Sequence, residues 1–139
     1  MNVEGKTVLI TGAGRGIGYG IAKDFGEAGA RLIIHYNKSK EGAESLKELF
    51  PSSLLVQGDI RSPQACKQIV DAAGEQLDVL INNAGINRDM LVLQMEDADW
   101  SSVIDVNLNA TFWMCRAAGE TMMRQRSGSI INITSISGI

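Results

Sequence analysis

Short apolar runs alternate along this chain with longer segments in which apolar residues recur at the spacing of a helix. This pattern is typical of repeated β-α-β units, which build a parallel sheet buried on both faces by helices. We therefore predict an α/β domain. Its five strands are expected at residues 7–10, 31–35, 53–57, 79–81 and 129–133, and its helices near residues 17–28, 40–49, 63–75 and 97–126.

Several of these boundaries carry local signals. Gly29 follows the first predicted helix as a stop, and Ser62 is placed as an N-cap before Pro63 in the first helical position. Residues 85–96 form the longest irregular stretch, and a loop of this length in a compact domain is usually functional. The sequence has no internal repeat or linker, so residues 1–139 are expected to form a single domain.

Composition and charge narrow the class of protein. The chain has 139 residues, 45% of them hydrophobic and 21% charged, which is typical of a soluble globular domain with one core. Its net charge of −3 argues against a nucleic-acid partner. With no signal peptide and no apolar run of membrane-spanning length, we expect a cytoplasmic protein without membrane contact. Cys66 and Cys115 lack metal-ligand spacing, so we expect reduced, half-buried thiols and no metal site.

The segment from Thr11 to Gly18, TGAGRGIG, is the clearest chemical signal. It joins a predicted strand to an amphipathic helix, and its four glycines permit a tight turn that brings backbone amides and the helix N-terminus to a diphosphate. Glycine-rich turns also occur where nothing binds, but this context favours a dinucleotide site. The spacing departs from strict Gly-x-Gly-x-x-Gly, and the lack of a following Gly-Lys-Ser/Thr excludes a nucleoside-triphosphate P-loop.

The end of the second predicted strand bears on the choice of cofactor. A site specific for NAD usually places an acid there to pair with the ribose 2′-hydroxyl. This chain instead has His35, Tyr36, Asn37 and Lys38. With no acid, and with Arg15 and Lys38 able to face a 2′-phosphate, NADP(H) is favoured over NAD(H). Lys38 could equally be a solvated loop residue, and His35, the only histidine, a strand-end residue without a catalytic partner.

Two further strand ends carry polar residues. Asp59 follows the third strand, where its carboxylate could accept a hydrogen bond from an adenine amino group or simply form a turn. The fourth strand runs into Asn82, Asn83, Ala84 and Gly85 at the carboxyl edge of the sheet, where open α/β sheets bind ligands. These asparagines could also be ordinary turn residues.

Five motifs together resemble the short-chain dehydrogenase/reductase family: TGAGRGIG, Asp59-Ile60, NNAG at 82–85, Asn107 in VIDVNL, and INITSISG at 131–138. The stretch GINRDMLVLQMEDADW is especially similar to the bacterial 3-oxoacyl-acyl-carrier-protein reductases within that family. The resemblance covers the whole chain and implies a doubly wound, Rossmann-like sheet with strand order 3-2-1-4-5. It also implies a homo-oligomer that uses NADPH to reduce a 3-oxoacyl thioester, or a similar carbonyl, in fatty-acid synthesis.

The resemblance implies a role for each matching residue. Asn37, beside Lys38, would lie at the adenosine ribose. Ser135 would hydrogen-bond the substrate carbonyl, and Asn107 would hold a water in the proton relay, although Ser135 could otherwise be one of several strand-end hydroxyls. The residues expected along the pyrophosphate, the adenine and the adjoining cofactor are Gly12, Ala13, Gly14, Arg15, Gly16, Ile17 and Gly18, then Asp59 and Ile60, then Asn83, Ala84 and Gly85.

The proton donor of the family is a tyrosine whose pKa is lowered by a lysine four residues later. That pair follows the serine, and the 139 residues end before it. Tyr19 with Lys23 and Tyr36 with Lys40 have the same spacing but lie at the pyrophosphate and adenosine ends, so we assign both to chance and surface packing. We therefore expect this chain alone to bind cofactor weakly and to turn over negligibly. The alternative is a non-catalytic nucleotide-binding fragment, or a subunit completed by another chain.

The long predicted helix bears on partners. By resemblance it would help form the oligomer, and its apolar bulk could serve a core or an interface, with the core as the default for Phe112, Trp113, Met122 and Met123. Arg124 and Arg126 near its end could simply complement the helix dipole. By similarity, Arg126 could also touch an acidic acyl-carrier protein. A phospho-receiver or flavin-binding domain of similar architecture is disfavoured, because receivers need acids after the first strand, where this chain has threonine and glycine.

Overall fold

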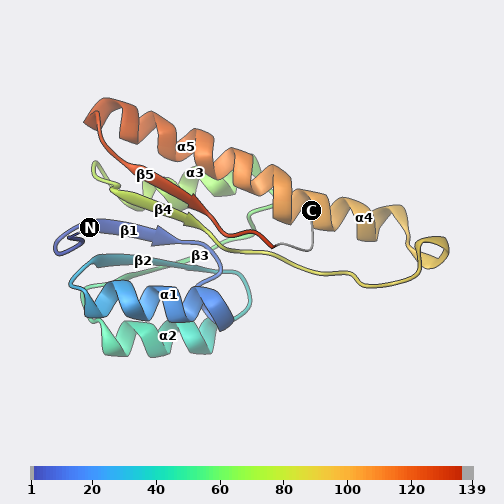
Figure 1. Ribbon diagram of the computed structural model, residues 1–139, viewed down its shortest axis with the longest axis horizontal. Helices are drawn as coiled ribbons and strands as arrows, with labels where there is room; N and C mark the ends of the chain where they lie inside the picture. Colours follow the sequence, from blue (N-terminus) through green and yellow to red (C-terminus); the bar gives the residue numbers. More distant parts are fainter. Residues whose placement is uncertain (1, 136–139) are drawn as a thin grey trace.

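The computed structural model describes residues 2–135 and contains a five-stranded parallel sheet (Figure 1). Its strand order is β3-β2-β1-β4-β5, which confirms the predicted order and fold class. Every strand begins and ends within one residue of its predicted bounds. The strands are β1 (Thr7–Ile10), β2 (Arg31–Tyr36), β3 (Leu54–Gln57), β4 (Val79–Asn82) and β5 (Ser129–Asn132).

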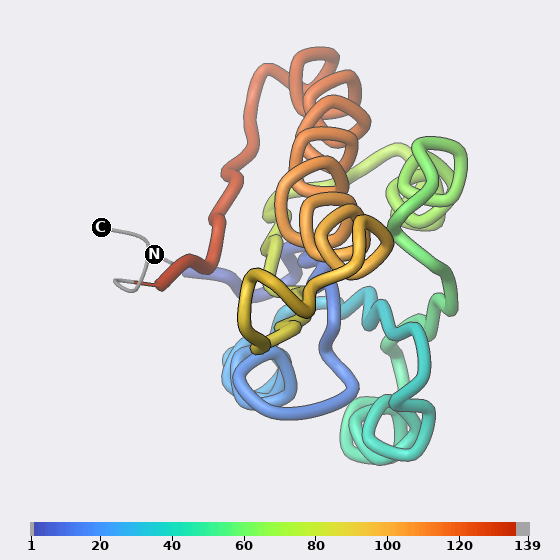
Figure 2. Tube along the Cα trace, turned by 90° about the vertical axis from the view of Figure 1, so that its right-hand side faces the viewer, coloured from blue at the N-terminus to red at the C-terminus, as the bar shows by residue number. Residues whose placement is uncertain are grey.

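Helices cover both faces of this sheet. Figure 2 shows α1 and α2 on one side of the strands and α3 and α5 on the other. This doubly wound arrangement buries β1, β2 and β4, as their nearly continuous apolar runs require. The edge strands β3 and β5 remain partly exposed, so the expectation of a sheet buried on both faces is wrong for them. The helices are α1 (Gly16–Glu27), α2 (Lys40–Leu49), α3 (Pro63–Asp71), α4 (Asp97–Ile104) and α5 (Ala110–Gln125), with a 3-10 turn η1 (Val92–Gln94) and a π-helical segment η2 (Asp105–Asn109).

The core forms two apolar layers, because successive side chains of a strand point to opposite faces of the sheet. On one face, Leu9 and Ile33 pack with Ile69 of α3 and Met114 of α5. On the other face, the residues that pack together include Val8, Ile10, Ile34, Ala22 of α1 and Leu46 of α2. Both layers fix the strand ends from which the candidate site is built.

Two predicted helices differ in extent from the structure. The third ends at Asp71, before Gly74 adopts a left-handed φ of 77°. The helix predicted over residues 97–126 is interrupted by η2, where the Thr111 hydroxyl donates to the Asn107 carbonyl oxygen at 3.1 Å. It ends at Gln125, and Arg126 follows with a left-handed φ of 55°. Periodicity alone does not reveal a π-helical segment, because the apolar spacing continues on both sides of it.

The outer face of α5 carries apolar residues that the sequence assigned to the core. Met122 is buried and Trp113 packs partly against the core, as expected. Phe112 and Met123 are 59% and 80% exposed, so the expectation of a core position is wrong for these two. Arg116 lies over the Phe112 ring, 5.2 Å from its centroid, in a surface cation–π contact.

Both cysteines are free thiols. Cys66 is fully buried rather than half-buried, and burial raises the pKa of its thiol to about 11. Cys115 is half-buried, and burial raises its thiol pKa as well. Within residues 2–135, no helix has the length and apolarity needed to cross a membrane, and no group of three or more acidic, histidine or cysteine side chains is placed to hold a metal ion.

Candidate cofactor site

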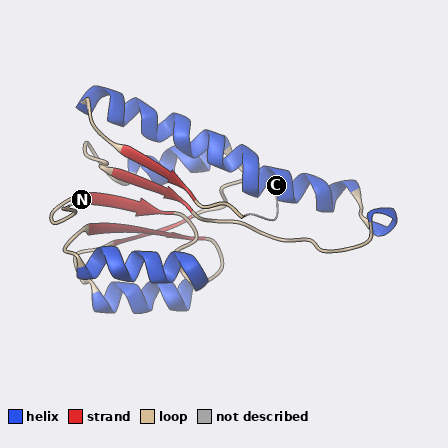
Figure 3. Ribbon diagram, in the orientation of Figure 1, coloured by secondary structure: helices blue, strands red, loops and turns tan. Residues whose placement is uncertain are grey.

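A cavity of about 740 Å³ lies at the carboxyl ends of β1 to β4. Beyond β4 the chain runs along the same side as a long loop that leads to η1 (Figure 3). Open parallel sheets bind ligands at this edge, where neighbouring strands connect to helices on opposite faces. Here β1 leads to α1, and β4 leads through the loop to α4 and α5. The predicted cofactor-binding residues that line the cavity are Gly12, Gly14, Arg15, Gly16, Ile17, Asn37, Lys38, Asp59, Ile60, Asn83, Ala84 and Gly85.

The glycine turn and the start of α1 form a cradle for an anion. Gly12 and Gly16 have left-handed φ angles of 66° and 57°, a conformation that favours glycine. Nothing lies within 4 Å of the place that a Cβ of Gly16 would take, so the turn is open there. The Arg15 side chain makes no capping hydrogen bond, which leaves the first amides of α1 available to a diphosphate. The residues present therefore fit the phosphates of a dinucleotide.

Ala13 and Gly18 pack the turn and do not line the cavity. Ala13 is fully buried in the core layer that contains α1 and α2. A Cβ on Gly18 would clash with the side-chain amide of Asn83. These two residues shape the turn from beneath, while direct contact with a cofactor remains a prediction for them.

Thr11 ties the glycine turn to the segment after β4. Its buried hydroxyl oxygen accepts hydrogen bonds from the backbone amides of Asn83 and Ala84, both at 3.0 Å. In return, Nδ2 of Asn83 donates to the carbonyl oxygens of Thr11 at 2.9 Å and Gly12 at 3.3 Å. The side-chain amide of Asn83 therefore holds β1 and β4 together at the cavity, a role that sequence reasoning missed.

His35 is buried beneath the turn, with only 1% of its surface exposed. Its Nδ1 accepts a hydrogen bond from the Gly12 amide at 3.2 Å, and its Nε2 lies 3.0 Å from the Gly58 carbonyl oxygen. Burial lowers the pKa of the imidazole from its ordinary value. These two partners of the ring are backbone groups, and sequence reasoning missed them; the available signal was the place of His35 inside the buried run of β2.

The adenosine end of the cavity, as the sequence predicts it, is formed by residues after β2 and β3. Arg61, which sequence reasoning missed, forks onto Asp59 with Nη2 2.5 Å from Oδ2 and Nε 3.0 Å from Oδ1. The Arg61 side-chain hydrogen bonds hold the pKa of the Asp59 carboxyl below its ordinary value, and the charge of Lys38 adds to the effect. The positive charge of Arg61 offsets the ionised carboxylate of Asp59. The additional charge of Lys38 therefore leaves this end of the cavity net positive and suited to an anion.

The two predicted catalytic residues lie outside the residues that line the 740 Å³ cavity. Asn107, in η2, accepts from the Ile86 amide through Oδ1 at 2.9 Å and donates to the Ile86 carbonyl oxygen through Nδ2 at 3.0 Å. It therefore holds the loop just after Gly85. Ser135 is exposed and follows β5, which is paired with β4, so it lies at the same edge of the sheet.

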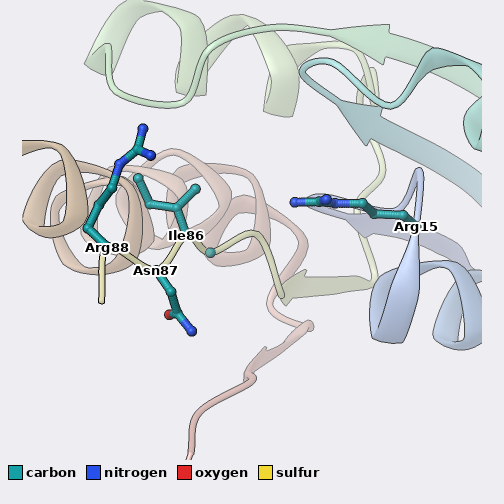
Figure 4. Close-up of a pocket in the computed structure, with 5 residues that line it drawn as sticks. Arg15, Ile86, Asn87 and Arg88 are labelled. Atoms are coloured by element: carbon teal, nitrogen blue, oxygen red, sulfur yellow. The ribbon is translucent and has the colours of Figure 1, made fainter. Parts of the chain in front are cut away.

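A smaller hollow of about 460 Å³ adjoins the loop after β4. Figure 4 shows Arg15 and Arg88 on opposite sides of it, with Ile86 and Asn87 between them. Nε of Arg88 lies 3.9 Å from a carboxylate oxygen of Asp99. Two guanidinium groups therefore border the part of the site between the glycine turn and this loop, which again favours an anionic ligand.

The two tyrosines of the chain, Tyr19 and Tyr36, lie on elements that do not adjoin β5, the strand that leads to Ser135. The Tyr19 hydroxyl, on α1, lies 3.1 Å from Oγ of Ser45 on α2. Tyr36 ends β2, which is separated from β5 by β1 and β4, and it is buried, so surface packing is wrong for it. Neither hydroxyl is placed as a proton donor beside Ser135.

A doubly wound parallel sheet with a glycine turn after β1 is typical of dinucleotide-binding proteins. The chain belongs to the short-chain dehydrogenase family, whose sequence model matches residues 6–139. This match confirms the resemblance that the motifs indicate, and it assigns the chain to a family of oxidoreductases.

Relatives of known name fall in the same family. The 3-oxoacyl-acyl-carrier-protein reductase FabG of Staphylococcus aureus is 40% identical over an alignment of 140 positions, which covers 96% of this chain and 57% of the relative. The 3-oxoacyl-acyl-carrier-protein reductase of Synechocystis is 36% identical over 141 residues, with the same coverage. A solved structure from Sinorhizobium meliloti, described as a short-chain alcohol dehydrogenase, matches with a TM-score of 0.91 and 31% identity over 98% of this chain and 56% of its own. The chain thus spans a little over half the length of these relatives.

Proposed function

We propose that this chain forms the NADP(H)-binding part of a reductase that converts a 3-oxoacyl thioester, held on an acyl-carrier protein, to the 3-hydroxyacyl thioester in fatty-acid synthesis. The cavity at the carboxyl edge of the sheet carries the cofactor half of this proposal. The names of the relatives support the substrate half. A cytoplasmic homo-oligomer is the form in which we expect the reductase to work.

The charges around the cavity favour NADP(H) over NAD(H). Arg15, Lys38, Arg61 and Arg88 all line it, and Arg61 already neutralises Asp59. At the end of β2, where an acid would repel a 2′-phosphate, the chain has Asn37 and Lys38. Lys38 would therefore face the 2′-phosphate, while the amides at the start of α1 would hold the diphosphate.

The nicotinamide of the cofactor would supply the hydride for reduction of the carbonyl. The Ser135 hydroxyl would donate a hydrogen bond to the substrate carbonyl oxygen and stabilise the negative charge that develops there. Asn107, through its paired hydrogen bonds to Ile86, keeps the loop after Gly85 in place beside this position. Proton delivery needs a donor beside Ser135, and neither Tyr19 nor Tyr36 lies there.

Fluorescence titration of the 139-residue chain with NADPH and with NADH tests the cofactor half. We expect tighter binding of NADPH, and we expect Lys38→Gln to weaken it by about tenfold, in line with the loss of one charge-assisted hydrogen bond. NADH affinity should change little. Lys67→Gln, on the exposed surface of α3, removes the same charge away from the cavity and should leave both affinities unchanged. Equal affinities for NADPH and NADH, or no binding of either, would contradict the proposal.

The positions of the tyrosines favour a second candidate, a nucleotide-binding module that does not catalyse by itself. Oxidation of NADPH with an acetoacetyl thioester tests whether this chain catalyses by itself. We expect the 139-residue chain to turn over negligibly, because no phenol lies beside Ser135. Turnover at ordinary enzymatic rates, about 1–10³ per second, would show that the module candidate is wrong and that another group delivers the proton.

A further inference from the structure

The imidazole of His35 is a buried titratable side chain that contacts the glycine turn and has no part in the function proposed above. It lies in β2, between β1 and β3 in the sheet. Its side chain reaches the turn after β1 on one side and the exit of β3 on the other, through Gly12 and Gly58. Its own carbonyl oxygen also accepts from the Ala13 amide at 2.9 Å. His35 thus holds two successive amides of the glycine turn.

The hydrogen-bond partners fix the protonation state of this imidazole. The Gly12 amide is a donor, so Nδ1 must be unprotonated and accept. The Gly58 carbonyl oxygen is an acceptor, so Nε2 must carry the proton and donate. Only the neutral tautomer with the proton on Nε2 satisfies both contacts. A second proton on Nδ1 would place two N–H groups against each other at the glycine turn.

We propose that His35 is a positioning residue, which fixes the phosphate-binding turn to the β3 exit through its neutral Nε2-protonated imidazole and thereby sets cofactor affinity. The inference rests on the proposed cofactor site. Gly58 immediately precedes Asp59, so the same ring orders both the turn and the predicted adenine end.

The charges near the ring determine how it responds to pH. Asp59 is the charged group that acts on His35, and its carboxylate favours the protonated imidazole. Arg61 and Lys38 in turn offset that carboxylate. Burial outweighs Asp59 and lowers the pKa of His35 below its ordinary value of 6.5. The neutral ring therefore makes its full contribution to the free energy of unfolding above the ordinary histidine pKa, and this contribution is lost as the pH falls below that value.

Because His35 is the only histidine, nitrogen NMR of the free protein reports on this ring alone. At about pH 7.5, above the ordinary histidine pKa, we expect the shifts of a protonated Nε2 and an unprotonated Nδ1, and slow hydrogen exchange of the Gly12 amide. A protonated Nδ1 under these conditions would overturn the proposal. This measurement needs no cofactor, so it decides on His35 even if NADPH does not bind and the proposed function fails.

Two variants then separate positioning from simple packing. His35→Leu keeps the bulk and removes both hydrogen bonds, and it should lower NADPH affinity by about tenfold and speed exchange of the Gly12 amide. His35→Asn keeps an acceptor at the δ position and should restore affinity to within about threefold of the wild type. Once the nitrogen shifts show that acid has protonated His35, NADPH binding to the wild type should be weakened more than binding to His35→Asn at the same pH, because asparagine does not titrate. If His35→Leu binds NADPH with wild-type affinity and its Gly12 amide exchanges at the wild-type rate, the proposal is overturned.

Discussion

Replacement of Gly42 by alanine should displace the glycine turn, although Gly42 itself lies outside that turn, in α2. Gly42 lies in the first turns of α2, and the place that its Cβ would take collides with the carbonyl oxygen of Gly14. The obstacle is backbone rather than a flexible side chain. To restore the 3.0 Å that real Cβ contacts keep, the glycine turn must move away from α2.

The free-energy balance of this change has two opposing parts. Alanine is favoured over glycine inside a helix by about 1 kcal/mol. Overpacking against a fixed backbone costs about 1–3 kcal/mol. We therefore expect Gly42→Ala to lower the free energy of unfolding by about 1 kcal/mol net, and the displaced turn to lower NADPH affinity by about tenfold.

Urea unfolding followed by circular dichroism, together with NADPH titration, measures both effects. Gly20→Ala is the matched control, because Gly20 is an exposed residue of α1 with nothing within 4 Å of its Cβ position. This control should gain about 1 kcal/mol of stability and keep wild-type affinity. If Gly42→Ala binds NADPH with wild-type affinity, the idea that the packing of α2 supports the glycine turn is wrong.

Three more outcomes are expected. Thr11→Val leaves the partly buried amides of Asn83 and Ala84 without this acceptor and should lower the free energy of unfolding in urea by about 1 kcal/mol, whereas Thr11→Ser should recover most of the loss. Equal stability of the two variants would be inconsistent with the hydroxyl contacts. Arg61→Gln should raise the pKa of Asp59 in a titration followed by NMR, and it should remove the stability that is present above the ordinary value of 3.8 and lost as the pH falls through the lowered folded-state pKa. A thiol reagent at about pH 8, below the ordinary cysteine pKa, should modify Cys115 before Cys66 in the folded protein, since Cys66 is fully buried; reaction of both at one rate would contradict this order.

Much of the fold could be predicted because three of its strands, β1, β2 and β4, are buried apolar runs, although the edge strands β3 and β5 are partly exposed. Apolar runs such as 79–81 mark a strand without ambiguity, and local signals at Gly29 and Ser62 mark the neighbouring helices; Gly29 has a left-handed φ of 84°, and Ser62 caps α3 through the Ala65 amide at 3.3 Å. The π-helical segment η2 could not be predicted, because the apolar spacing continues on both sides of it. The contact of Asn107 with Ile86 also joins residues that are far apart in sequence, and pattern does not reveal it.

The candidate site shows the same division. The glycine turn is local in sequence, so its conformation follows from residues 12–16 themselves. The partners that hold it come from β2, β4 and α2, and pattern alone does not reveal them. His35 was therefore assigned no role, and Asn83 was assigned to the cofactor, although its side-chain amide is engaged by Thr11 and Gly12. Phe112 and Met123 were predicted in the core for a similar reason, because the apolar face of a helix does not reveal from sequence which element packs against it. Both residues are exposed.

We propose that a dinucleotide binds at the carboxyl edge of the sheet, with its phosphates on the glycine turn. Titration of the nitrogen-labelled chain with NADPH, followed through backbone amide shifts, locates the bound cofactor. We expect the largest shifts at Gly14, Gly16, Lys38 and Gly85, which line the cavity, and small ones along the outer face of α5 near Met123. Unchanged amides in the glycine turn at saturating NADPH, or shifts confined to α5, would contradict the account.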